Sequence, residues 1–499
     1  MNFTPTMVFG VAVLAIPAAA FVLLAALTAL PGRREERTVV RLATGALWLS
    51  LLASVATVVS AWEPLTHGGL SVPLGAWFSV PGYSLQSVLL LDLPGAVFMM
   101  LTTSLIILVS VYSGRYLHRE PGFARFFLLL LLFAVGMLAI AAGGSLDIVF
   151  GGWELVGLSS ALLIAFFHRR EAPVRHGLRA FAVYRACDVG FLAGVVLFHE
   201  LVHTSVFAEA FPQLSVERSP LAVNGIALLF VVAAMGKSAM LPFTGWLPRA
   251  MEGPTPSSAI FYGALSIHAG PFLLLRLAPL LEAAPVARAV IVGTGAITAL
   301  HATTVGRAQN DIKSKLAYAS VAQVSLIWVE LGLGLHTLAL VHIVGHATLR
   351  TWELLRAPSY LRDWRLRQEV QRQHVRGRWA SPQQVPSGRS RRAVSRHAGA
   401  LVPGRAGDGC GQPRGIGAAR AGSPRQQGVD AAGRTLHRPR VRRASSGRGR
   451  RGGEPWRFLN RCCSWSLWVC PSPPPWASGV GPGSPPTGPS CLRRPSSQR

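Results

Sequence analysis

Three ionisable side chains lie in stretches apolar enough to be buried in a membrane: Lys237, Glu154 and Asp188. A lone ammonium at membrane depth costs roughly 3 kcal/mol, so a chain keeps one where it moves charge or is paired. Pro242 must break the helix that carries Lys237, and broken helices at membrane depth are tolerated mainly where they line a polar cavity. One base, two acids and a helix break therefore predict a proton path through a membrane.

The lysine is the centre of this predicted path. Burial favours the neutral amine and a nearby carboxylate favours the ammonium, so a movement of Glu154 toward or away from Lys237 would load or release a proton. Two acids facing one lysine would titrate as a coupled set. Structural alternatives stay open: Lys237 can snorkel or be paired for structure, and the acids can be satisfied by Trp, Tyr or Arg. Arg185, three residues before Asp188, would form such a helical pair.

A second set of polar residues lies near the end of the apolar region. His342, His346 and Arg350 stand at i, i+4 and i+8 and so form one stripe of a helix. Two histidines four residues apart can bind zinc, but HExxH is absent and no third ligand is evident. The pattern favours a water wire with neutral histidine relays, and core histidines bonded to the backbone are the alternative. Glu330 and His268 are secondary candidates.

Catalytic motifs of soluble enzymes are absent from the sequence. It contains no GxGxxG after a strand, no P-loop, no GxSxG and no cysteine set for an iron–sulfur cluster. The chain alone should therefore not oxidise NADH, and we expect neither a cofactor nor a metal in it.

The elements that must position these residues are membrane helices. The chain has 499 residues, 50% hydrophobic and 14% charged, and its apolar runs reach the roughly 20 residues that a span needs. We expect an all-α polytopic bundle of about 11 helices with a discontinuous helix near 235–245, its first helix retained rather than cleaved. The predicted spans are 7–30, 41–62, 85–112, 124–142, 146–167, 180–199, 221–241, 257–280, 286–305, 316–334 and 335–356.

Basic residues predict the orientation of this bundle. They cluster in alternate loops, after the first, third, fifth and ninth spans, which should be cytoplasmic. We therefore expect a multi-pass protein of the cell inner membrane with its N-terminus outside. The clusters consist of Arg33, Arg34, Arg37, Arg41, Arg115, Arg119, Arg125, Arg169, Arg170, Arg175, Arg179, Arg307, Lys313 and Lys315.

The C-terminal part has a different composition. Residues 351–499 hold 28 of the chain's 49 lysines and arginines, and they account for most of the net charge of +27. We divide the chain into a transmembrane domain, 1–362, and an Arg/Gly/Pro-rich disordered tail, 363–499. Binding of nucleic acid or anionic lipid, a cysteine metal site and an inert tail are alternatives. We favour a shifted reading frame of a GC-rich gene, and so expect the lipid bilayer but no nucleic acid as a partner.

Several long motifs resemble one known family. They are WELVGLSS at 153–160, GKSAMLPFTGWL at 236–247, MEGPTPSSA at 251–259 and DIKSKLAYAS at 311–320. All are similar to the antiporter-like subunits of respiratory complex I, in particular chain 5 or subunit L, which the Mrp sodium/proton antiporters share. The resemblance spans about residues 5–362.

The resemblance implies roles for the candidate residues. It makes Glu154 the helix-5 glutamate and Lys237 the helix-7 lysine of a proton channel. It also makes Asp188 the helix-6 acid, and His342 and His346 the helix-11 histidines.

Departures from the family pattern indicate a smaller branch. Tyr262 stands where the family usually has histidine, Arg350 replaces the helix-11 lysine, and the helix-12 lysine has no visible counterpart. Residues 258–268 and 349–359 resemble the DabB-type membrane subunit of an inorganic carbon pump. That resemblance implies a separate zinc-containing, carbonic-anhydrase-like DabA-type partner.

These resemblances lead to one preferred function and two alternatives. We expect a proton- or sodium-conducting membrane subunit of an energy-coupled CO2/bicarbonate uptake complex. The first alternative is a proton-translocating subunit among the membrane subunits of a complex I-like NADH–quinone oxidoreductase. The second is a truncated scaffold that transports nothing.

Overall fold

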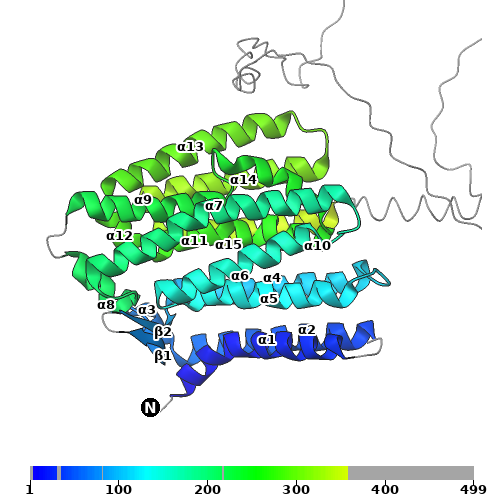
Figure 1. The fold of residues 1–499 in the computed structure, drawn as a ribbon, viewed down its shortest axis with the longest axis horizontal. Helices are drawn as coiled ribbons and strands as arrows, with labels where there is room; N and C mark the ends of the chain where they lie inside the picture. The colour runs from blue at the N-terminus through cyan, green and yellow to red at the C-terminus, as the bar shows by residue number, and fades with distance from the viewer. Residues whose placement is uncertain (1–3, 31–34, 81–82, 216–218, 358–499) are drawn as a thin grey trace, which may run out of the picture. The chain divides into compact units, whose positions relative to one another are not determined.

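Long helices dominate the structure and lie roughly side by side (Figure 1). The computed structural model describes residues 4–30, 35–80, 83–215 and 219–357, so the tail predicted from residue 363 lies outside the described residues. The long helices are α1 (Pro5–Ala29), α2 (Glu36–Ser60), α4 (Leu93–Tyr116), α5 (Phe123–Ala142), α6 (Leu146–Ile164), α7 (Glu171–Val202), α9 (Pro220–Lys237), α13 (Pro285–Arg307), α14 (Ile312–Gly332) and α15 (His336–Arg356).

The predicted all-α polytopic fold is confirmed. Within the described ranges, nine helical segments are long and apolar enough to cross a membrane, among them the interrupted segment Thr255–Arg276. The helices α14 and α15, of 21 residues each, fall on the last two predicted spans but carry more polar residues. The described part of the chain thus has a helix at each of the eleven predicted spans.

Capping residues explain where several of these helices begin. The side chain of Asp92 accepts a hydrogen bond from Gly95 N at the start of α4. Ser145 and Asp311 do the same for α6 and α14. Such caps satisfy amide groups that a helix leaves without an intrahelical partner, which matters most where lipid offers none.

A two-stranded hairpin replaces the start of the predicted third span. The strands β1 (Leu70–Val80) and β2 (Tyr83–Leu91) pair antiparallel, with Leu70 opposite Leu91. The hairpin contacts the α5–α6 connection, where Gly144 N donates to Val88 O at 2.8 Å. The span predicted at 85–112 is therefore wrong in its first residues, because β2 ends at Leu91 and Asp92 begins the helix.

The basic loops come together at one end of the helices. His118 Nδ1 lies 2.6 Å from a carboxylate oxygen of Glu36, which joins the α1–α2 and α4–α5 connections. Arg125 Nη2 donates to Phe166 O at 2.9 Å and so links the α4–α5 and α6–α7 connections. This arrangement agrees with the up-and-down path that the alternating basic clusters predict.

Two helices are interrupted in mid-course. The helix α9 ends at Lys237, followed by short helical turns. The second interruption lies in the segment from α10 to α11, where a π-helical turn, η4, precedes η5. The short helical elements are α3 (Trp62–Thr66), α8 (Phe207–Ala210), η1 (Phe211–Ser215), η2 (Phe243–Trp246), η3 (Pro248–Glu252), α10 (Thr255–Ser258), η4 (Ala259–Ala264), η5 (Ser266–His268), α11 (Ala269–Arg276) and α12 (Ala278–Glu282).

Candidate functional site

The break after α9 places Lys237 inside the protein. Its side chain is 1% exposed, and α9 ends with this residue. Ala239 has a φ of 55°, which turns the chain away from the helix. The Gly236 carbonyl accepts a hydrogen bond from Trp246 Nε1 at 3.1 Å, so the break leaves this carbonyl satisfied. The discontinuity predicted near 235–245 is confirmed.

The ammonium group of Lys237 is held by a carbonyl and two aromatic rings. Its Nζ donates to the Trp153 carbonyl oxygen at 2.8 Å. It also lies 4.6 Å from the Trp153 ring centroid and 5.0 Å from that of Tyr184, which favours a cation. Gly157 makes room for it, because a Cβ there would lie 3.0 Å from Nζ.

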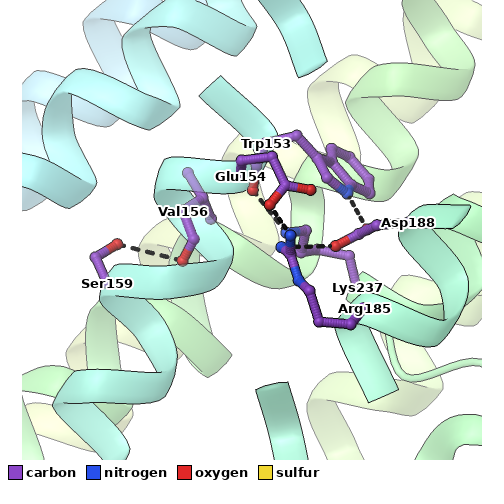
Figure 2. A network of polar contacts seen from close by, with 7 residues as sticks. All are labelled: Trp153, Glu154, Val156, Ser159, Arg185, Asp188 and Lys237. Atoms are coloured by element: carbon purple, nitrogen blue, oxygen red, sulfur yellow. Dashed lines mark hydrogen bonds and ion pairs between the residues drawn. The ribbon is translucent and has the colours of Figure 1, made fainter. Parts of the chain in front are cut away.

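Arg185 contacts both carboxylates of the site. Figure 2 shows its guanidinium between Glu154 and Asp188. One terminal nitrogen donates to Glu154, and the other lies 2.9 Å from Asp188 Oδ2. Trp153 Nε1 donates to Asp188 Oδ1 at 2.5 Å. Together with Lys237 and Tyr184 these residues form what we call the lysine cluster.

The arrangement differs from a direct lysine–carboxylate switch. Glu154 contacts Arg185 instead of Lys237, and the Arg185–Asp188 helical pair raised as the structural alternative is present. In the described residues, no carboxylate lies within ion-pair distance of Lys237. Glu154 Oε1 and the Tyr184 hydroxyl are buried without a hydrogen-bond partner there. The cluster thus holds two basic groups, two carboxylates and polar atoms without a partner. Lys237, Tyr184 and Asp188 are buried, whereas the Arg185 and Glu154 side chains are 35% and 27% exposed.

The second interrupted helix positions a pair of histidines. His268 follows the π-helical turn η4, and π-turns of this kind often mark functional positions. Its Nδ1 lies 2.5 Å from the Ala264 carbonyl oxygen, and its Nε2 lies 2.9 Å from His346 Nδ1. His346 Nε2 is buried with no partner in the described part of the chain.

His342 belongs to a different pair of contacts. Its Nδ1 lies 2.8 Å from Glu330 Oε1, and its Nε2 lies 3.1 Å from Gln323 Oε1. The His342 and His346 rings are nearly perpendicular, with centroids 6.5 Å apart. We call His268, Gln323, Glu330, His342 and His346 the histidine cluster.

Arg350 does not continue this chain of contacts. Its Nη1 donates to Glu353 on its own helix at 2.6 Å, and its side chain packs near Gly263. The predicted stripe of His342, His346 and Arg350 therefore lies on one helix, but its three members face different partners. The proposed role of Arg350 in a proton path stays a prediction.

A hydrogen bond from a side chain to a backbone carbonyl brings the two clusters close together. Ser238 Oγ donates to the Ile267 carbonyl at 3.0 Å, which holds the residue after Lys237 against the residue before His268. Among the described side chains, no direct hydrogen bond or ion pair joins Lys237 to His268, so a proton passing between them needs another carrier, such as water.

Two participants in these clusters were not among the predicted residues. Gln323 stands seven residues before Glu330 on α14, and this spacing places two polar side chains on one face of an apolar helix, which is a signal for a shared site. The Trp153 carbonyl is a backbone group, so no residue type in the sequence points to it. In the described ranges, no three His, Cys, Asp or Glu side chains are grouped to hold a metal ion.

An ion pair stabilises the C-terminal end of the second interrupted helix. Arg276, the last residue of α11, donates to Asp92 and also, at 2.6 Å, to the Ala141 carbonyl. Asp92 in turn caps α4 through Gly95 N. One buried guanidinium thus ties together α11, α4 and the end of α5.

Two family descriptions match the chain. Residues 143–370 match "NADH:quinone oxidoreductase/Mrp antiporter, TM", and residues 77–127 match "NADH-Ubiquinone oxidoreductase (complex I), chain 5 N-terminus". The lysine cluster and the histidine cluster both lie within the first match.

Similar proteins include subunits of NADH–quinone oxidoreductases and a chain of an Mrp complex. NADH-ubiquinone oxidoreductase chain 5 of Cryptococcus neoformans var. grubii is 36% identical over 66% of this chain and 49% of its own. NADH-quinone oxidoreductase subunit L of Rhodobacter capsulatus is 34% identical over 65% of this chain and 48% of its own. A chain in the structure of the Mrp complex from Dietzia sp. aligns with a TM-score of 0.59 and 26% identity, over 70% of this chain and 37% of that one. The chain spans about half the length of these two curated relatives.

Proposed function

We propose that this chain is an ion-translocating subunit of a larger membrane complex. The premise is that residues 77–127 and 143–370 belong to the family of antiporter-like membrane subunits. The observation that carries the proposal is the burial of Lys237 at a helix break. Its ammonium lies among a carbonyl and two rings, beside a guanidinium with two carboxylates. Such a buried group is retained at a cost, and proton transfer explains why it is retained.

The named relatives support one kind of complex over the other. They belong to NADH–quinone oxidoreductases and to an Mrp complex, so we place a complex I-like or Mrp-like assembly before the inorganic carbon pump expected from the sequence. Arg350, in place of the family's lysine, is the observation that keeps carbon uptake as the second candidate. We further propose the cell inner membrane, with the N-terminus outside and the basic loops inside.

A flux measurement tests ion translocation. The full chain in proteoliposomes should pass protons when a membrane potential is imposed, and Lys237→Ala should abolish this flux. Lys315→Ala is the matched control, since Lys315 is exposed and lies outside both clusters. Unchanged flux in Lys237→Ala would contradict the proposal, and no flux in the unaltered chain would favour the scaffold.

Co-purification tests the partners. The N-terminally tagged chain, extracted in mild detergent, should recover membrane subunits of an oxidoreductase or antiporter complex. Recovery of one large zinc-containing protein would instead support the carbon pump with its DabA-type partner. Replacing the proton gradient with a sodium gradient in the flux assay would show which ion is carried.

A further inference from the structure

We propose that Glu330 is the proton-releasing end of a relay that starts at His346, which is held in place by His268, and passes through His342. This inference rests on the proposed ion translocation and names the residue at which a proton leaves the described part of the chain. It follows from the direction of the hydrogen bonds in the histidine cluster and from the way burial decreases along it.

The buried end of the relay has a fixed hydrogen-bond direction. The Ala264 carbonyl can only accept, so His268 Nδ1 must carry a hydrogen. In neutral His268 the Nε2 atom is then an acceptor, and it takes the Nδ1 hydrogen of His346 at 2.9 Å. His346 Nε2 is left as a bare acceptor, buried and without a partner in the described residues. That atom is therefore ready to take a proton.

The outer end has the opposite property, because both nitrogens of His342 face oxygen atoms. Nδ1 lies 2.8 Å from Glu330 and Nε2 lies 3.1 Å from Gln323. An imidazolium satisfies both contacts by donating twice. When Nδ1 gives its proton to Glu330, the neutral ring keeps its hydrogen on Nε2, and this N–H group continues to donate to Gln323 Oε1.

The transfer step balances without any co-reactant. The Nδ1–H bond of His342 breaks and an O–H bond forms on Glu330, which leaves a neutral carboxylic acid. Glu330 Oε2 is buried with no partner in the described part of the chain, so it can accept a hydrogen bond from water while the O–H group, once turned away from His342, gives its proton to another water molecule. The 6.5 Å between the His346 and His342 ring centroids is crossed by a ring rotation or through one water molecule.

Burial gives the relay its direction. His268 is fully buried and His346 is 5% exposed, whereas the Glu330 and His342 side chains are 17% and 23% exposed. Glu330 lies two residues before the end of α14, next to the turn into α15. This turn lies at the other end of α14 from Asp311 and the basic loops. A proton that reaches Glu330 has therefore arrived near the opposite membrane face.

The experiment compares three carboxylate variants of the full chain in the proteoliposome flux assay. Glu330→Gln still accepts a hydrogen bond from His342 but cannot bind a proton, and proton flux should fall on the order of a hundredfold. Glu282→Gln removes an exposed carboxylate beside the α12–α13 connection and should leave the flux unchanged. Glu330→Asp retains a titratable group and should transport faster than Glu330→Gln.

The outcomes separate this inference from the proposed function. Flux that is lost in Lys237→Ala but unchanged in Glu330→Gln would overturn the relay and leave ion translocation standing. Equal losses of flux and of unfolding temperature in Glu330→Gln and Glu330→Asp would also overturn it, because the His342 contact would then only join two helices. No flux in the unaltered chain would refute the proposed function, and the relay with it.

Discussion

Replacing Gly157 with alanine probes the lysine cluster without removing any of its polar groups. The added Cβ would lie 3.0 Å from Lys237 Nζ and 3.3 Å from Arg185 Nη2. The ammonium cannot retreat freely, because the Trp153 carbonyl lies 2.8 Å away and two aromatic rings flank it. The substitution therefore pushes a charged group off its hydrogen-bond acceptor.

The expected effect on transport can be worked out from these distances. A Cβ contact of 3.0 Å is tighter than nine in ten real ones, so the neighbour must give by a few tenths of an ångström. A hydrogen bond to a charged group contributes about 1.5 kcal/mol or more, and losing about 1.4 kcal/mol is a tenfold change in an equilibrium. We therefore expect proton flux to fall about tenfold in Gly157→Ala.

Stability should change little, because two effects oppose each other. Alanine is favoured over glycine inside a helix by about 0.5–1 kcal/mol, which offsets part of the lost hydrogen bond of Lys237. Gly151→Ala is the matched control, because it lies on the same helix and a Cβ there meets nothing within 4 Å. Flux in proteoliposomes and thermal unfolding in detergent should both be measured. Equal flux in the two variants would refute the argument that the position of Lys237 Nζ sets the rate.

Two further predictions concern packing. Arg276→Ala leaves Asp92 and the Ala141 carbonyl without their buried cation and should lower the free energy of unfolding by about 3 kcal/mol; a loss below about 1 kcal/mol in denaturant titration would contradict this. Gly236→Ala places a Cβ 2.5 Å from Cys187 Cβ and should destabilise by about 1–3 kcal/mol. Adding Cys187→Gly should restore the unfolding temperature, and an unchanged temperature in the single variant would show that the helices separate without cost.

The helices could be predicted because lipid imposes length and composition on them. Every apolar run of spanning length became a helix, and the break near Pro242 followed from proline's missing N–H. The hairpin could not be predicted in the same way. Residues 83–91 combine alternation with a short leucine-rich run, and periodicity alone does not separate such a strand from the start of a buried helix.

The candidate site was predicted in its residue types but only partly in its pairing, since the Arg185–Asp188 pair was expected and the Arg185–Glu154 pair was not. Charged groups in apolar segments stand out in a sequence, which is why Lys237 and Glu154 were found. Their partners depend on how helices rotate against each other, and the sequence does not state that Arg185 stands between the carboxylates. Nor does any residue type reveal that Lys237 is bound by a backbone carbonyl.

Both clusters lie where a helix is broken, and this shared position has a physical cause. A break exposes backbone carbonyls, which cost several kcal/mol each if left unsatisfied in lipid. Here a side chain binds one carbonyl at each break: Trp246 donates to the Gly236 carbonyl and His268 to the Ala264 carbonyl. The first contact fixes the end of α9 directly before Lys237, and the second fixes the tautomer of His268. The same bonds that make the broken helices tolerable therefore also orient Lys237 and, through His268, the His346 ring.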